Sequence, residues 1–363
     1  MNLRLLGTGA ADGIPAFYGR DRVSRHAREA GGKDRRTRSA AVLDGVVKID
    51  LGPDTYAQCV RDGIDPRDWT AILFTHSHED HLAVSELQYA LYPFTEQEQL
   101  PAAIYGNATV CRKIRERYPD WPLELHETRS FEPFVHGAYS VTPVRAFHTE
   151  GEDCHNLLIE RDGRAILYAT DTGVWQEETF RFLEGRPLHA IVLECTDALC
   201  PSTYDGHLDL AEMVMVVGRL REGGSITEGT EIVSTHHAAS GLATHAELEA
   251  AFAPHGFAVG FDGAPPARAM ATLDLVRLGH RRRREPIARD RFLRLRDRAA
   301  GIDDRRGIAV GERPGKPRFV DENGRDVPQL GHPAPDERSV GILVVPLFDR
   351  VVDPQRVDAR GAR

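Results

Sequence analysis

The sequence predicts a layered α/β fold, and two observations support this prediction. Strand-like and helix-like patterns alternate from about residue 39 to residue 260, an order typical of layered α/β domains. Several short apolar runs also end in histidine or aspartate, and active sites of such folds commonly lie where strands end. We therefore expect one large domain with its site at the strand ends.

The first elements follow from the apolar pattern. The opening run, residues 3–6, is expected to be a strand, whereas residues 15–38 are rich in charge and turn-forming residues, which predicts a long loop. Strands follow within residues 39–50, and a helix is expected near residues 55–63. The apolar run at residues 71–74 predicts a buried strand.

Four potential metal ligands follow this strand within six residues: His76, His78, Asp80 and His81. Imidazole nitrogens and carboxylate oxygens are the ligands that borderline divalent cations such as zinc prefer. A His-X-His pair at the end of a strand can direct both rings to one ion, and the next two ligand types are expected to face a second ion. We expect a helix to begin after this cluster.

Three further ligand types end later strand-like runs: His148 after residues 139–147, Asp171 after residues 165–170, and His236 after residues 231–235. Together with the first cluster, this order resembles the hallmark of the metallo-β-lactamase superfamily, His-X-His-X-Asp-His followed by a later His, Asp and His. The resemblance covers residues 1–270. It implies a four-layered αβ/βα metallo-β-lactamase sandwich, in which two packed sheets carry helices on their outer faces.

The resemblance also implies two divalent transition-metal ions. One ion would be held by His76, His78 and His148, the other by Asp80, His81 and His236, and Asp171 would bridge the two. The ions are expected to share a hydroxide of lowered pKa that acts as the nucleophile, and Asp80 is assigned a catalytic as well as a ligating role. The histidines favour zinc, and the carboxylates also suit manganese or iron.

Segments 6–15, 52–54, 206–207 and 235–236 are similar to the branch that contains the cyclic-phosphate phosphodiesterase of phosphonate breakdown and, more distantly, the tRNA 3′-end endonuclease. In that branch the histidine of the Gly-His segment is a proton donor, so the resemblance implies that His207 is a general acid. The alternative is a surface-loop histidine without a catalytic role.

Two substrate-binding candidates lie elsewhere. Arg38 carries a guanidinium fork that suits a phosphate, although a solvated surface role is the alternative. Asn156, close to His148 in the sequence, could hold a ligand imidazole or the substrate. Relatives in the phosphodiesterase branch carry cysteines for a structural zinc after the Gly-Ile-Pro turn, but residues 16–24 here contain none, so we expect no structural zinc.

The leading hypothesis is a binuclear phosphodiesterase for a small cyclic or nucleotide-like phosphodiester. The bridging aspartate and the Gly-His segment favour attack at phosphorus. The alternatives are hydrolysis of a lactone, thioester or other carboxylic ester, RNA processing as a nuclease, and a non-catalytic, metal-bound scaffold.

Composition restricts the partners and the location. The net charge of -9 argues against a general binder of nucleic acid or of anionic membranes, although nucleic acid is kept as an alternative partner. Five cysteines without a CxxC spacing suggest reduced thiols. The start of the chain lacks a leader-like pattern, and no apolar run reaches about 18 residues. We expect a cytoplasmic protein, with a homodimer as one option.

Residues 271–363 differ in composition and are expected to form an Arg-rich C-terminal extension. Residues 281–298 hold nine arginines against three acids, which is typical of a solvated helix or arm, although contact with phosphates is the alternative. The apolar run at residues 340–345 predicts a short strand.

Overall fold

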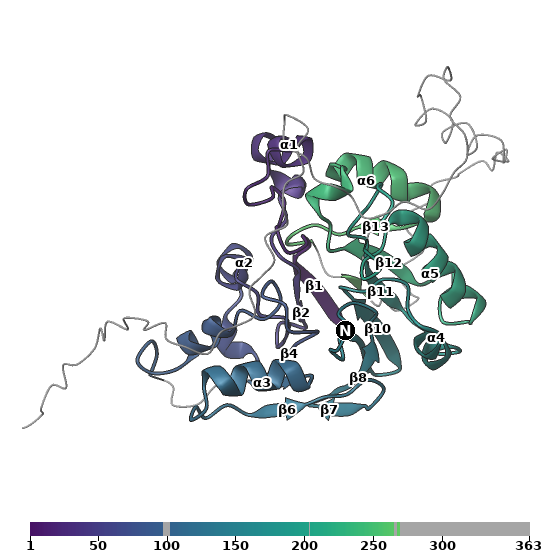
Figure 1. Cartoon of the computed structure of the whole chain (residues 1–363). Coiled ribbons are helices and arrows are strands. Elements are labelled where there is room, and N and C mark those ends of the chain that lie inside the picture. The colour runs from purple at the N-terminus through teal and green to yellow at the C-terminus, as the bar shows by residue number, and fades with distance from the viewer. Residues whose placement is uncertain (97–101, 203, 265–266, 269–363) are drawn as a thin grey trace, which may run out of the picture. The chain divides into compact units, whose positions relative to one another are not determined.

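The computed structural model describes residues 1–96, 102–202, 204–264 and 267–268. These residues form two seven-stranded sheets with helices on their outer faces (Figure 1). Each sheet combines an antiparallel part with a parallel part.

The first sheet has the strand order β14-β1-β2-β3-β4-β5-β6. Its strands are β1 (Asn2–Gly7), β2 (Ala40–Leu43), β3 (Val47–Ile49), β4 (Ala71–Leu73), β5 (Ala103–Gly106), β6 (Leu125–Glu127) and β14 (Ala267–Arg268). The second sheet has the order β13-β12-β11-β10-β9-β8-β7. Its strands are β7 (Phe134–His136), β8 (Tyr139–Arg145), β9 (His155–Arg161), β10 (Arg164–Ala169), β11 (Ala190–Glu194), β12 (Glu231–Thr235) and β13 (Ala258–Val259).

Six α-helices accompany these sheets in the described part of the chain. They are α1 (Arg22–Ala30), α2 (Thr55–Asp62), α3 (Ala108–Arg117), α4 (Glu177–Leu183), α5 (Leu210–Glu222) and α6 (His245–Phe252). Short 3-10 helices are found at Gly32–Asp34, Pro66–Asp68, Val84–Ala90, Ala239–Gly241 and Ala253–His255.

Three apolar clusters separate four layers. Leu43 and Tyr168 belong to a cluster formed by residues of both sheets, so the sheets pack face to face. A second cluster joins the first sheet to helix residues such as Val110, and a third joins the second sheet to Met213 and Phe252. Each such buried side chain stabilises the fold by about 1.5 to 3 kcal/mol. The predicted αβ/βα sandwich is therefore confirmed.

The parallel strands bring several strand ends to one edge of each sheet. Strands β3, β4 and β5 run parallel, as do β10, β11 and β12. Asp50, Asp171 and His236 follow β3, β10 and β12, and all three have left-handed backbones, with φ of 57°, 52° and 57°. This conformation is uncommon for residues other than glycine, and it tends to occur at functional sites.

The prediction of a loop over residues 15–38 was wrong for its middle part, which forms α1. Asp21 caps this helix, because its side chain accepts a hydrogen bond from the backbone N–H of Ser24 at 2.7 Å. Val23 and Ala27, four residues apart, are buried. The polar residues around them obscured this narrow apolar face in the sequence.

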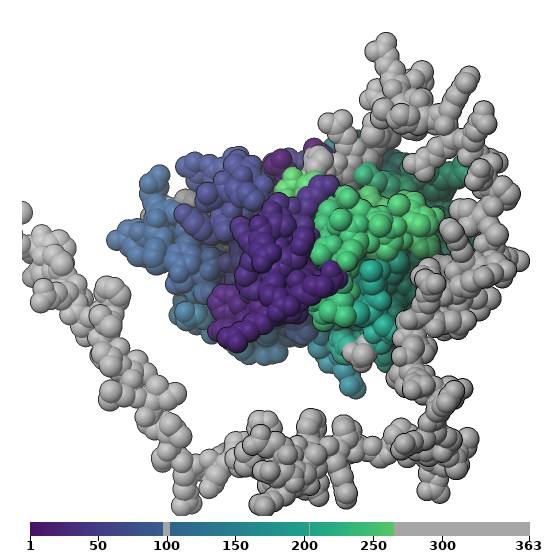
Figure 2. Space-filling model, turned by 90° about the horizontal axis from the view of Figure 1, so that it is seen from above, coloured from purple at the N-terminus to yellow at the C-terminus, as the bar shows by residue number. Residues whose placement is uncertain are grey.

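Helix α1 lies beside α6, although the two are far apart in the sequence. Arg22 donates a hydrogen bond to Glu247 at 3.0 Å, and Lys33 donates one to Glu249 at 3.1 Å. Figure 2 shows the corresponding purple and green surfaces in contact. Residues 22–33 near the start of the described domain are thus held against α6 near its end.

The expected helix after the ligand cluster is also absent, and residues 75–83 form a loop. The backbone N–H of Leu51 donates to the carbonyl of His81, and the N–H of Ala83 donates to the carbonyl of Leu51, both at 2.8 Å. The carbonyl of His81 and the N–H of Ala83 therefore cannot form the hydrogen bonds of an α-helix. A 3-10 helix, Val84–Ala90, follows instead.

The predicted C-terminal extension and the strand at residues 340–345 lie outside the described residues, so both stay predictions, as does the boundary near residue 270. Across residues 1–96, 102–202, 204–264 and 267–268, no helix has the length and apolar character needed to cross a membrane.

Candidate metal centre

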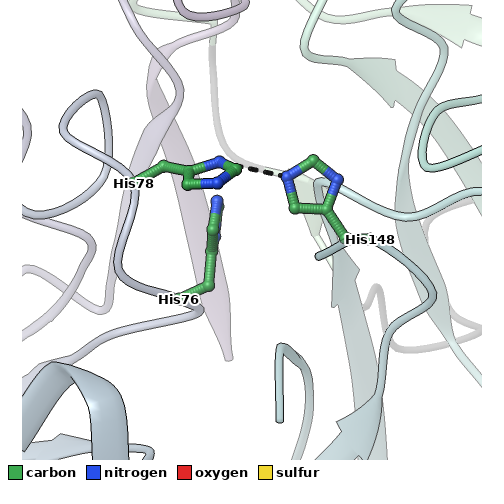
Figure 3. A group of neighbouring side chains, drawn as sticks. All are labelled: His76, His78 and His148. Atoms are coloured by element: carbon green, nitrogen blue, oxygen red, sulfur yellow. Dashed lines mark hydrogen bonds between the residues drawn. The ribbon is translucent and has the colours of Figure 1, made fainter. Parts of the chain in front are cut away.

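Three histidines from two loops converge on one point. His76 and His78 follow β4, and His148 follows β8; their ring centroids are 4.5 to 4.9 Å apart. Ring nitrogens of all three lie within 4.8 Å of one another. Figure 3 shows the rings facing a common point, with Nε2 of His148 3.2 Å from Nδ1 of His78. The set predicted for the first ion is therefore assembled.

A second, fully buried group lies beside the first. It consists of Asp80, His81, Asp171 and His236. Oδ2 of Asp171 is 3.0 Å from Nε2 of His81 and 3.1 Å from Nε2 of His236. Oδ1 of the same carboxylate is 3.6 Å from Nε2 of His148 and 3.9 Å from Nε2 of His76. The two oxygens of Asp171 thus face different groups, as a bridging carboxylate requires.

The buried donor atoms fit divalent cations. Nε2 atoms of His76, His81 and His236 are buried and make no well-aligned hydrogen bond, although carboxylate oxygens lie close to them and buried polar atoms are usually satisfied. Imidazole nitrogens and carboxylates are also the donor set that zinc and similar metals accept. A metal ion would supply the missing partner for each of these nitrogens.

The charge states of two ligands suit metal binding. Burial, together with the charge of His81, lowers the pKa of His76 well below its usual value, which leaves the neutral imidazole that binds metals. Burial alone would raise the pKa of Asp171, but His236 and His81 outweigh it and hold that pKa well below the usual range. The carboxylate is thus ionised.

Hydrogen bonds to the opposite ring nitrogens orient the histidines. Nδ1 of His81 is 2.7 Å from Oδ2 of Asp50, and Nδ1 of His236 is 2.8 Å from Oγ1 of Thr196. Nδ1 of His148 is 3.0 Å from the carbonyl oxygen of Gly206. Such partners fix the tautomer and increase ligand basicity.

His207 lies beside His148 and His236. It is paired with the carboxylate of Glu194, which was not identified from the sequence. Nδ1 of His207 is 2.7 Å from Oε1 of Glu194, which is completely buried. Burial disfavours the imidazolium, but the charge of Glu194 and its hydrogen bond outweigh this effect and raise the pKa of His207 to about 9. His207 is therefore protonated at neutral pH in the metal-free protein.

One hydroxyl connects this pair to the centre. Oγ1 of Thr196 donates to Oε2 of Glu194 at 2.6 Å and accepts from Nδ1 of His236 at 2.8 Å. A ring nitrogen of His207 also lies within 4.8 Å of potential ligand atoms of His148 and Asp171. Geometry alone therefore permits His207 to be either a proton donor or a ligand.

Residues of both ligand groups, together with His207, line an open cavity of about 440 Å³. Its polar lining residues are Asp12, His78, Asp80, His148, Asp171, Tyr204, His207, His236 and Ser240. This volume lies within the usual range for small-molecule sites. Asp12 and Tyr204 were not identified from the sequence, where nothing distinguishes them from other loop residues.

The two substrate-binding candidates have other partners. Arg38 donates to the carbonyl of Ala11 at 3.0 Å and pairs with Asp54 at 3.3 Å. Asn156 is buried and donates to the carbonyl of Thr170 at 2.8 Å, directly before Asp171. Neither side chain lines the cavity. Direct contact with substrate stays a prediction for both.

The cysteines take no part in the ligand groups. All five are unpaired, and none belongs to a cluster of ligand types in the described part of the chain. Residues 16–24 lead into α1. The expectation that this segment lacks a structural zinc stays a prediction.

Several solved structures share the fold. A diphosphatase from the PhnP family has a TM-score of 0.58 at 23% identity, with 72% of this chain and 95% of that chain covered. Zn(2+)-bound PqqB from Methylobacterium extorquens gives 0.58 at 17% identity, with coverages of 72% and 98%. The metallo-beta-lactamase fold protein YhfI from Bacillus subtilis gives 0.53 at 17% identity, with the same coverages. No curated protein matches significantly.

A family model described as a beta-lactamase superfamily domain matches residues 46–236. This range exceeds half of the chain and extends from the start of the first parallel strands to the last predicted ligand. With the two ligand groups at the strand ends of a four-layered sandwich, the match shows that the chain belongs to the beta-lactamase superfamily and has its metal-dependent hydrolase fold.

Proposed function

We propose that this protein is a binuclear metal-dependent phosphodiesterase that acts on a small cyclic or nucleotide-like phosphodiester. One observation carries the proposal: His207, paired with the buried Glu194, lines the cavity beside Asp171, whose two oxygens face two ligand groups. A proton donor next to a binuclear centre suits a substrate whose leaving group departs as an alkoxide.

The proposed ligands are the seven residues of the two groups, His76, His78 and His148 with Asp80, His81, Asp171 and His236. Two cations bound there would supply positive charge for a phosphate and lower the pKa of a water molecule. Five imidazoles favour zinc, and the two carboxylates leave manganese and iron as alternatives.

The chain itself supplies the proton. Glu194 accepts the hydrogen bond from Nδ1 of His207, so the second proton of the imidazolium is on Nε2. His207 lines the cavity, where it can donate this proton to the departing alkoxide. Asp80 also lines the cavity, which agrees with the catalytic role proposed for it in addition to ligation.

The proposal includes a small-molecule partner and a cytoplasmic location. Unpaired cysteines fit a reducing compartment. One of the similar structures is described as a diphosphatase, which is consistent with phosphate chemistry on this fold.

A substrate panel tests the proposal. Purified protein reconstituted with zinc or manganese is assayed with bis-p-nitrophenyl phosphate, p-nitrophenyl phosphate, a lactone and nitrocefin. We expect hydrolysis of the diester to exceed that of the other three, and Asp171→Ala to abolish it. Preferred cleavage of the lactone or of nitrocefin would instead support attack at a carboxylic carbon.

A further inference from the structure

Tyr204 forms part of the cavity wall beside His207. Its ring centroid is 5.5 Å from that of His207, at an interplanar angle of 67°, and 6.0 Å from that of His148, at 75°. The side chain is 49% exposed although its hydroxyl donates to the carbonyl of His148 at 2.6 Å. An accessible aromatic surface is thus held next to the proposed proton donor.

The loop that carries Tyr204 is held by close packing. A Cβ atom at Gly206 would lie 2.4 Å from Cε1 of Tyr204, and one at Gly173 would lie 1.7 Å from the carbonyl oxygen of Asp205. At Gly173 the backbone of Asp205 leaves no room for a side chain, and at Gly206 the Tyr204 ring itself lies against the backbone. The hydroxyl of Tyr204 donates a hydrogen bond to the carbonyl of His148, which holds the ring against the Gly206 backbone and beside the site.

The position of Tyr204 restricts the leaving group. The oxygen that receives a proton from His207 must approach that imidazole, so the group attached to this oxygen lies near the tyrosine ring. Aromatic rings stack favourably on flat partners, including every nucleobase. Asp12 and Ser240, which line the same cavity, offer polar atoms for the edge of such a group.

We propose that Tyr204 is a specificity-determining residue that stacks a planar leaving group, so that the protein prefers phosphodiesters of nucleosides to those of small alkyl alcohols. This inference rests on the proposed phosphodiesterase function and names its substrate class. The proposed stacking uses the ring of Tyr204 and not its hydroxyl, which already donates a hydrogen bond to the backbone carbonyl of His148.

Two diesters of similar leaving-group acidity test the preference: methyl phosphate esterified to the 5′-hydroxyl of thymidine or to 2-methoxyethanol. In the metal-reconstituted protein, Tyr204→Ala should lower kcat/KM for the thymidine ester by roughly 5- to 50-fold, the scale of one base–aromatic stack. The kcat/KM for the methoxyethyl ester should fall much less, because this ester has no planar group to stack on the ring. Tyr204→Phe should keep the wild-type preference because the ring remains.

A matched control is Tyr89→Ala, since Tyr89 is 50% exposed and lies outside this cavity; both kcat/KM values should be unchanged. An equal loss on both esters in Tyr204→Ala, reproduced by Tyr204→Phe, would overturn the inference and show that Tyr204 acts by holding His148. If the wild-type protein cleaves both esters equally well, only this inference fails. If it cleaves no phosphodiester, the proposed function fails as well.

Discussion

Nδ1 of His207 lies 2.7 Å from Oε1 of Glu194, a carboxylate with no exposed surface. The same carboxylate accepts hydrogen bonds from the backbone N–H groups of Thr172 and Leu208 at 2.8 and 3.1 Å. These donors favour the ionised form, and the pKa of Glu194 is lowered because His207 and its hydrogen bond outweigh burial. The ionised carboxylate of Glu194 therefore lies next to Nδ1 of His207 and stabilises its imidazolium form.

Replacing this charge should change the titration of His207. In the metal-free protein the pKa of His207 is raised to about 9. Glu194→Gln removes the largest of the charges that raise this pKa, whereas Asp171 and Asp197 remain and burial still opposes them. We expect the pKa to fall from about 9 toward the ordinary value of about 6.5, as measured by NMR titration of the metal-free protein. A pKa that stays near 9 in the variant would show that another group holds the proton.

The raised pKa of His207 also makes the stability of the metal-free fold depend on pH. Because the folded pKa of His207 lies above the unfolded value of about 6.5, its charged pair with Glu194 stabilises the metal-free fold fully below that pH. The contribution is lost as the pH rises through about 9. The difference in unfolding midpoint between wild type and Glu194→Gln should thus be larger at pH 6 than at pH 10.

The fold could be predicted where the apolar pattern was strong. The run at residues 231–235 became β12 with the expected bounds. Its last four residues are buried, and it is an inner strand in the parallel part of the second sheet. Helix α1 was missed because it is only nine residues long and most of the residues around its buried Val23 and Ala27 are polar. The helix expected after the ligand cluster failed because backbone pairing with Leu51 is a long-range contact that local patterns do not contain.

Asp171→Ala should affect both proposed ions. Its oxygens face the two ligand groups separately, so its removal takes one carboxylate oxygen from each. Elemental analysis should find about two transition metals per wild-type chain and fewer in the variant, together with lower turnover. A variant with full metal content and full activity would remove Asp171 from the site.

The residues after Pro15 lead to a further prediction, that no structural metal is held there. Residues 16–24 contain no cysteine, and four of the five cysteines of the chain are buried elsewhere. Alkylation of accessible thiols in the folded protein should therefore leave the metal content unchanged. Stoichiometric zinc loss on alkylation, with the activity retained, would contradict this expectation.

The site could be predicted only where its residues carried a local signal. Asp171 and His236 each follow an apolar run, and their side chains are typical metal ligands. Glu194 is the last residue of β11 and has the pattern of an ordinary polar strand end. Its function depends on a hydrogen bond to a residue 13 positions later, which no spacing rule specifies. Asp50 could have been considered, since it also follows an apolar strand.

The last prediction concerns the role of His207, which lines the cavity and lies near several ligand atoms. If it is the general acid, His207→Ala should leave both metals bound and lower kcat by roughly 10²- to 10⁴-fold for diesters with poor alkoxide leaving groups. For p-nitrophenyl diesters the loss should be much smaller, because p-nitrophenolate departs without a proton.

The comparison of the two substrate types separates this role from its alternatives. A histidine that positions the phosphate contributes equally to both substrates, so its removal should lower both rates by the same factor. A histidine that coordinates an ion should change the metal content on replacement. His207→Gln provides a further control, because its amide can still donate a hydrogen bond but cannot transfer a proton near neutral pH. If His207 transfers a proton, His207→Gln should cleave diesters with alkoxide leaving groups as slowly as His207→Ala. If His207 only positions the phosphate, His207→Gln should cleave them at the wild-type rate.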